Sequence, residues 1–156
     1  MKVLKFGGTS VADSRSIDKV ISILKSNDES LFIVVSALSG ITNLLQKCLN
    51  KNGESVSDII TEIEQRHLQV ITDMCDYNSQ TSLKNFLRDN LNELDDLLNL
   101  ISDTGEVSNE KKSKVLTLGE ILSSNIIYEI LRQKGLDISH IDSRELIFTK
   151  NSNSNI

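Results

Sequence analysis

The sequence contains no proline and has only two cysteines and two histidines among its 156 residues. Without proline no helix has a proline stop signal, so the expected helix ends depend on Gly, Asn and Ser. Cys48 and Cys75 are expected to be free, packed thiols of a reducing compartment. His67 and His140 lie far apart, which argues against a metal site or a Ser-His-Asp triad.

Positive charge and long apolar runs are scarce as well. The formal net charge of -5 argues against non-specific binding to nucleic acid, which needs a basic face. Apolar runs such as Leu31–Val35 are far too short to span a bilayer, and no secretory leader follows Met1. We therefore expect a cytoplasmic protein with neither nucleic acid nor membrane as a partner. The length fits one domain or a piece of a larger one.

The first fifty residues alternate strand and helix patterns. Strands are expected at residues 2–6 and 30–36, with helices at 14–26, capped by Ser14 or Ser16, and at 42–50. Leu31–Val35 is continuously apolar, which predicts a strand buried on both faces of a parallel sheet. This order predicts an α/β fold with mainly parallel strands.

The middle of the chain has a different pattern. Residues 55–103 contain two amphipathic helical patterns separated by a polar break at 76–79, which predicts an antiparallel hairpin against the α/β core. A polar loop at 103–112 and a helix at 115–131 follow, and Gly135 is expected in the left-handed cap position. Further strands are expected at 136–141 and 143–149, before a polar tail at 150–156.

The turn after the first strand is the sharpest chemical signal. Gly7 and Gly8 are expected to adopt positive φ and approach a ligand, while Thr9 and Ser10 add hydroxyls beside the amides. Together with the amino end of the next helix, this turn predicts a cradle for phosphate. Lys5 is placed to neutralise phosphate charge in a transition state. The alternative is an ordinary strand–turn–helix junction, since neither a Walker A loop nor a G-x-G-x-x-G loop is present.

Two further segments carry small or polar residues at similar positions. Residues 35–43 (VSALSGITN) again follow a strand, and offer amides and hydroxyls to an anionic substrate. The alternative is that Ser39 or Thr42 only caps the next helix. Glu120, in residues 118–124 (LGEILSS), could bind a substrate ammonium group or merely complement a helix dipole near the start of its helix.

Taken together, the three segments resemble the aspartate kinases of the amino acid kinase family. The similarity lies in KFGGTSV at 5–11, VVSALSGITN at 34–43, GEILSS at 119–124 and the D-x-R segment at 142–144, in that order. The resemblance implies a partial three-layer α/β/α amino acid kinase fold. The predicted helical pair resembles the insertion of these enzymes, including those fused to homoserine dehydrogenase.

The resemblance implies transfer of the γ-phosphoryl group of ATP, with Mg²⁺, to the side-chain carboxylate of L-aspartate. This reaction is the first step toward lysine, threonine and methionine. Lys5 would be catalytic, and Gly7, Gly8, Thr9 and Ser10 would border the phosphate path. The residues that would bind aspartate are Ser36, Ala37, Thr42 and Glu120, and no metal-ligating residue is expected.

In the family the kinase domain continues well beyond 156 residues, so residues 1–150 are expected to form its N-terminal part, with the helical insertion at about 55–103 and a polar tail at 151–156. Most of the nucleotide site would then lie outside this chain, as in a truncated kinase. We expect a homo-oligomer or association with the remaining kinase half. The alternative is a non-catalytic α/β module that binds a small amino acid or a partner chain.

Overall fold

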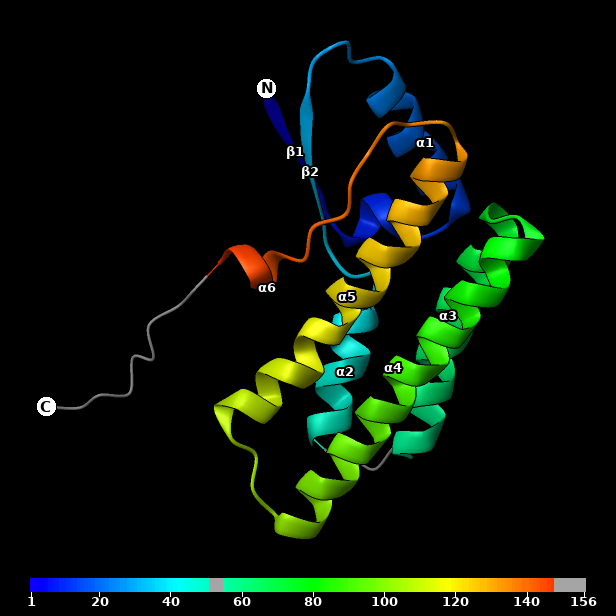
Figure 1. Ribbon diagram of the computed structural model, residues 1–156. Helices are drawn as coiled ribbons and strands as arrows, with labels where there is room; N and C mark the ends of the chain where they lie inside the picture. Colours follow the sequence, from blue (N-terminus) through cyan, green and yellow to red (C-terminus); the bar gives the residue numbers. More distant parts are fainter. Residues whose placement is uncertain (51–54, 148–156) are drawn as a thin grey trace, which may run out of the picture.

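The computed structural model describes residues 1–50 and 55–147 (Figure 1). Two strands and a series of helices follow one another along the chain. Their bounds are β1 (Lys2–Phe6), the 3-10 helix η1 (Gly8–Val11), α1 (Ser14–Lys25), β2 (Leu31–Val35), α2 (Ile41–Asn50), α3 (Val56–Met74), α4 (Tyr77–Thr104), α5 (Asn109–Gln133) and α6 (Ser143–Leu146). The predicted helices of the first fifty residues and of the hairpin are confirmed to within a few residues.

The two strands form a parallel pair connected through α1. Lys2 lies opposite Leu31 and Phe6 lies opposite Val35, so the carboxyl ends of both strands meet at one edge. Parallel strands need such a crossover because the chain must return to the starting end of the sheet before the second strand begins, which a tight turn cannot achieve. The predicted strand–helix–strand unit is therefore confirmed. The segments that follow β1 and β2 leave the sheet at the same edge.

One face of the sheet is open within the described chain, so the prediction that Leu31–Val35 is buried on both faces is wrong. Phe32 and Val34 are 40% and 37% exposed, and Val3, which pairs with Phe32, is 64% exposed. The described helices cover the opposite face, where Leu4 and the alternate residues of β2 pack against the core. Exposed and packed side chains alternate along β2 because the described helices cover only one face of the sheet.

Helices α3 and α4 form the predicted hairpin, with only Cys75 and Asp76 between them (Figure 1). The Asp76 carboxylate accepts a hydrogen bond from the Ser79 amide at 2.9 Å and so caps α4. The Ser79 hydroxyl donates to Glu129 of α5 at 2.6 Å, which ties the hairpin turn to the far end of α5. The hairpin is thus packed against the rest of the fold.

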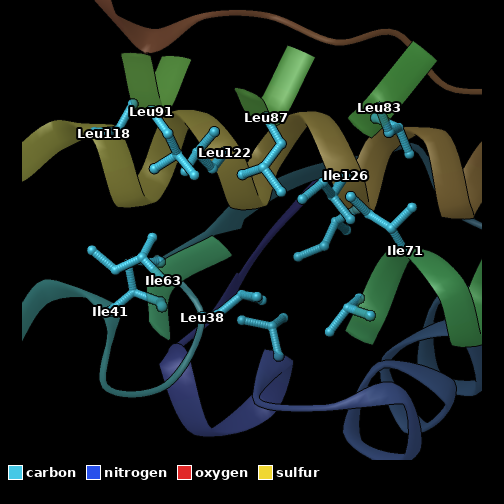
Figure 2. Close-up of a cluster of buried hydrophobic side chains, with 14 of the residues drawn as sticks. Leu38, Ile41, Ile63, Ile71, Leu83, Leu87, Leu91, Leu118, Leu122 and Ile126 are labelled. Atoms are coloured by element: carbon cyan, nitrogen blue, oxygen red, sulfur yellow. The ribbon is translucent and has the colours of Figure 1, made fainter. Parts of the chain in front are cut away.

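Buried aliphatic side chains of the hairpin, of α5 and of the segment after β2 form one continuous core (Figure 2). Leu87 of α4, Ile63 of α3 and Leu122 of α5 are fully buried, as is Ile41 at the start of α2. Burying a side chain of this size stabilises the fold by about 1.5–3 kcal/mol. The helical bundle and the sheet therefore share a core.

Helix α5 ends at the predicted left-handed glycine. Gly135 has φ of 82°, its amide donates to Arg132, and the next amide, of Leu136, donates to the Leu131 carbonyl at 3.2 Å. This bonding pattern is a Schellman motif, in which orphan carbonyls of the last turn find donors. The predicted cap at Gly135 is confirmed.

The strand predicted at 136–141 is wrong. This segment runs back beside α5 without joining the sheet: the His140 ring lies 5.5 Å from the Tyr128 ring, and His140 Nε2 lies 3.2 Å from Ser124 Oγ. These contacts with α5 take the place of pairing with the sheet, which shows how weakly β-propensity alone determines a strand. The predicted strand at 143–149 is wrong over 143–146, which is helix α6. Residues 148–149 and the predicted tail lie outside the described residues.

Both cysteines are free and buried, as predicted. Burial raises the pKa of each thiol to about 11, so neither is a reactive thiolate near neutral pH. None of the helices in the described part of the chain is long and apolar enough to cross a membrane.

His67 is a fully buried polar side chain on α3. Its Nδ1 lies 2.7 Å from the Ile63 carbonyl, whereas Nε2 has no hydrogen-bond partner among the described residues. Burial, with a smaller contribution from the Arg66 charge, lowers the pKa of His67 to about 4, against the hydrogen bond to Ile63. The imidazole is therefore neutral in the folded chain at pH 7.

This buried imidazole predicts loss of stability on mild acidification. An unfolded histidine protonates near pH 6.5, so between pH 6.5 and pH 4 the unfolded chain binds the extra proton and stability falls as pH falls. We expect the free energy of unfolding to drop by about 2 kcal/mol from pH 7 to pH 5, measured by urea denaturation.

A matched pair of variants isolates this effect. His67→Gln is expected to remove most of that pH dependence, while His140→Gln, at an exposed position, is expected to keep it. Equal pH dependence in both variants would show that His67 is not the group responsible.

Candidate functional site

The first loop begins where β1 ends, and its backbone differs from the prediction. Gly7 has φ of -76° and Gly8 is not in the positive-φ region either, so the expectation that both glycines need that region is wrong. Gly8 instead opens the 3-10 turn of η1, closed by a hydrogen bond from the Ser10 amide to the Gly7 carbonyl at 2.9 Å. The loop therefore turns at once, and Thr9 is held at its exposed surface.

The amino end of α1 is already occupied by a carboxylate. Asp13 precedes the helix and accepts a hydrogen bond from the Ser16 amide at 2.8 Å. This bond lowers the pKa of Asp13, so the cap is negatively charged at neutral pH. The prediction that Ser14 or Ser16 caps α1 is wrong, and so is the expectation that this helix end is open to a phosphate.

Gly8 allows the first loop to lie close to the second loop, which we define as residues 36–40 between β2 and α2. A Cβ added at Gly8 would lie 3.1 Å from the Ala37 carbonyl oxygen and 3.5 Å from the Ser39 Cα. A side chain at this position would therefore push the two loops apart. The structure thus brings together two segments that the sequence separates by about thirty residues.

The second loop is fixed by its backbone. The Ser36 amide donates to the Phe6 carbonyl at 3.0 Å, and the Ser36 carbonyl accepts from the Ser123 hydroxyl at 2.9 Å. Both backbone groups of Ser36 are therefore used, and its side chain is half-buried at the carboxyl end of the sheet. Ala37 is buried, and its methyl group points into the core toward α5. Any contact of Ala37 with a ligand would involve its backbone.

Neither Ser39 nor Thr42 occupies the cap position of α2. The helix begins at Ile41, so Thr42 lies inside it, and Gly40 precedes it. The Gly40 carbonyl accepts the first helical hydrogen bond, from the Leu44 amide at 3.1 Å. The predicted alternative, in which Ser39 or Thr42 only caps the helix, is therefore wrong. Thr42 is exposed on the first turn of α2.

Helix α5 reaches the second loop through two small residues. A Cβ on Gly119 would lie 2.8 Å from the Ala37 Cβ, closer than real Cβ atoms approach their neighbours, and 3.2 Å from Ile41 Cγ2. Ser123, one turn later, is fully buried beneath Ser36. Glu120 lies beside Gly119 and is exposed, near the middle of α5. Its predicted alternative role at a helix amino end is therefore wrong.

Lys5 is exposed on the open face of the sheet, next to the carboxyl end of β1. It pairs in register with Val34, one residue before β2 ends. The predicted site residues thus lie on segments that meet at one edge of the sheet: β1 and η1, the segment after β2, and the middle of α5. Asp142, by contrast, belongs to a local motif.

That motif caps α6. The Asp142 carboxylate accepts from the Arg144 amide at 2.9 Å and from the Arg144 guanidinium, and these bonds lower the pKa of Asp142 to about 2. Both residues are satisfied by one another, so the D-x-R segment acts here as a helix start.

Two contacts at the second loop have no local signature in the sequence. Arg66 of α3 donates to the Ser39 carbonyl at 3.0 Å across 27 residues of sequence. Ser123 was likewise assigned no role of its own. Neither contact has a local pattern, because each joins residues on different elements.

Comparison with known proteins places the whole chain in one family. Residues 1–156 match the model of the amino acid kinase family. An aspartokinase from Chlamydia muridarum is 29% identical over 147 residues, which cover 94% of this chain and 31% of that protein. A chloroplastic bifunctional aspartokinase/homoserine dehydrogenase from Arabidopsis thaliana is 27% identical over 157 residues, which cover 98% of this chain and 17% of that protein.

A solved structure has the same fold. Aspartokinase III from E. coli, in complex with aspartate and ADP, superposes with a TM-score of 0.77 and 24% identity over 88% of this chain and 30% of that one. These matches confirm the resemblance indicated by the motifs and, with it, the α/β fold class. The chain spans less than a third of the length of the aspartokinases that it matches.

The contact at Gly119 predicts a penalty for the smallest possible side chain. Gly119→Ala would force α5 away from Ala37, because a Cβ at 2.8 Å from the Ala37 Cβ cannot be accommodated. We expect a cost of about 2–3 kcal/mol, in the upper part of the range for overpacking, partly offset by about 1 kcal/mol of helix propensity. We expect a net loss of about 1–2 kcal/mol in urea denaturation at pH 7. Ser113→Ala, at an exposed position of the same helix, is the control. Unchanged stability in Gly119→Ala would contradict the close packing.

Proposed function

This chain belongs to the amino acid kinase family, and on that premise we propose that it forms the L-aspartate-binding part of an aspartate kinase. The reaction is ATP + L-aspartate giving 4-phospho-L-aspartate and ADP, in a cytoplasmic enzyme of lysine, threonine and methionine biosynthesis. The observation that carries this proposal is the meeting of both glycine loops and α5 at the carboxyl edge of the sheet. Ligands of open α/β sheets bind at that edge.

The proposed roles follow the chemistry of each residue. The Ser36 and Thr42 hydroxyls and the backbone at Ala37 line the aspartate pocket, and the Glu120 carboxylate meets the substrate ammonium group. Support for these ligands comes from the E. coli neighbour, which was solved with aspartate and ADP. Lys5 stabilises the charge of the transferring phosphoryl group, since it is exposed next to the carboxyl end of β1.

The phosphates of ATP would approach the first loop. Gly7, Gly8, Thr9 and Ser10 offer a turn with little side-chain bulk, and the first amides of such a turn have no carbonyl partner within it. Within residues 1–50 and 55–147 no group of three His, Cys, Asp or Glu side chains is placed to hold a metal ion. Mg²⁺ is expected to come with the ATP phosphates, whose charge it neutralises.

The nucleotide-binding strands would be provided by the rest of a kinase domain, in the same polypeptide or as a partner chain. Phosphoryl transfer of this kind needs positioning and charge stabilisation and no covalent enzyme intermediate. A second candidate is a non-catalytic module that binds a small amino acid or a partner chain. It is favoured by the fact that the described sheet has only two strands. Addition of the rest of a kinase domain as a second polypeptide distinguishes the two: formation of ADP from ATP and L-aspartate supports the kinase part, whereas L-aspartate binding in calorimetry without any turnover favours the module.

The role of Glu120 can be tested by removing either partner of the proposed ion pair. We expect Glu120→Gln to weaken L-aspartate binding about tenfold or more in calorimetry, because a charge-assisted hydrogen bond is lost. Succinate lacks the ammonium group, so its affinity is expected to be equal for the unaltered chain and for Glu120→Gln. Glu93→Gln, at an exposed position of α4, is the control. A variant that loses affinity for succinate as strongly as for aspartate would refute the assignment.

The role of Lys5 concerns turnover rather than binding. With the rest of a kinase domain supplied as a second polypeptide, we expect Lys5→Ala to lower kcat about 10²–10³-fold in a coupled ADP assay, with little change in KM for aspartate. The control is Lys2→Ala at the other end of β1, where Lys2 pairs with Glu29 at 2.7 Å. Undiminished kcat in Lys5→Ala would remove the catalytic role.

A further inference from the structure

Residues 38–41 form a tight turn that leads from the buried end of the second loop into α2. The Ile41 amide donates to the Leu38 carbonyl at 3.0 Å, and Gly40 has φ of 81°. This is the value of the third residue of a type II turn. In type I the central peptide is rotated, so the Ser39 carbonyl would point the other way. The direction of that one carbonyl therefore distinguishes two forms of the turn.

Arg66 of the helical hairpin binds that carbonyl. Its Nη1 donates to Ser39 O at 3.0 Å, while its Nη2 donates to the Glu62 carboxylate at 2.6 Å one turn earlier on α3. The two bonds hold the planar guanidinium at two points, an arrangement that a single ammonium group cannot reproduce. A Cβ on Gly40 would lie 2.8 Å from Arg66 Nη1, so the guanidinium packs directly on the glycine.

One side of this turn borders an open pocket of about 220 Å³, lined among others by Leu38, Ser39, Arg66 and Asp13. Leu38 and Ile41, at the two ends of the turn, are buried in the core. Gly8 approaches Ser39, and Gly119 approaches Ile41. The Arg66 bond is made to the central peptide of the turn, beside the hollow.

We propose that Arg66 is a positioning residue that holds the 38–41 turn against α3 and so couples the helical hairpin to the proposed aspartate site. The turn joins Ser36 and Ala37 on one side to Thr42 on the other. Without the Arg66 bond this turn would lose its tie to α3, and the Thr42 hydroxyl would be held less firmly relative to Ser36 and Ala37. The significance of the turn for aspartate rests on the proposed function; the hold of Arg66 on the turn does not.

The test compares amide hydrogen exchange in the purified chain. We expect Arg66→Gln to raise the exchange rate of the Ile41 amide about tenfold or more relative to the amides of Ile126–Ile130 in α5, because a charge-assisted bond to the turn is lost. Arg66→Lys is expected to restore part of the protection, since a lysine can reach one partner but not both. Glu62→Gln is expected to have a smaller effect in the same direction.

Arg88→Gln, on α4, is the matched control for the loss of an arginine. Arg88 donates to Asn85 on its own helix and makes no bond to the loop. If Arg66→Gln and Arg88→Gln give equal Ile41 exchange, the proposal is overturned. It is also overturned if Ile41 and the α5 amides accelerate together, because the effect is then general destabilisation.

Calorimetry with L-aspartate tests the link to the site. We expect Arg66→Gln to bind L-aspartate several-fold more weakly than Arg88→Gln, with Arg66→Lys between them, and equal dissociation constants would overturn the coupling. Failure of the unaltered chain to bind aspartate would contradict the proposed function alone. The exchange comparison would then decide by itself whether Arg66 fixes the turn.

Discussion

The contact between Gly119 and Ala37 is the constraint on which the rest of the site depends. Because Gly119 has no side chain, α5 lies directly against the segment that leaves β2. That distance allows the Ser123 hydroxyl to reach the Ser36 carbonyl. Glu120 follows Gly119 directly on the same helix. A larger residue at one position would displace a helix, a hydrogen bond and a carboxylate together.

The same helix belongs to the bundle. Leu122 and Ile126 of α5 pack with Leu83 and Leu87 of α4 in the shared core (Figure 2), and the Ser79–Glu129 bond ties the far end of α5 to the hairpin turn. Side chains in such a core are close-packed, so a displacement in one element is passed to its neighbours. The hairpin therefore supports the loops at the sheet edge although it contributes none of the proposed ligand-binding side chains.

Local patterns were sufficient for most of the fold and for naming the segments that meet at the carboxyl edge of the sheet. The spacing of Ile17, Val20, Ile21 and Leu24 identified α1, and the paired glycines marked the loop after β1. The patterns failed where an outcome depends on a distant partner. The segment at 136–141 lies beside α5, where His140 contacts Tyr128 and Ser124, and does not join the sheet. Phe32 is exposed because the described helices cover one face only. Arg66 was missed because its partner is 27 residues away.

The glycines show the same limit in another form. Gly135 was assigned correctly because a left-handed cap is a local feature of a helix end. Gly7 and Gly8 were assigned the wrong conformation, since the need for Gly8 arises from the Ala37 carbonyl beside it and not from its own backbone angles. A glycine in the sequence indicates that a side chain is not tolerated at that position, but only the neighbouring atoms in the structure show whether the cause is a backbone angle or a close contact.

The open face of the sheet has a consequence for how this sequence changes over time. Val3, Phe32 and Val34 are exposed, so within the described chain polar replacements there remove little buried surface. Purifying selection acts on such positions only if another surface covers them in the cell. The rate at which these three positions drift to polar residues in descendants of this gene, relative to the buried Leu4 face, therefore records whether the face is covered in living cells.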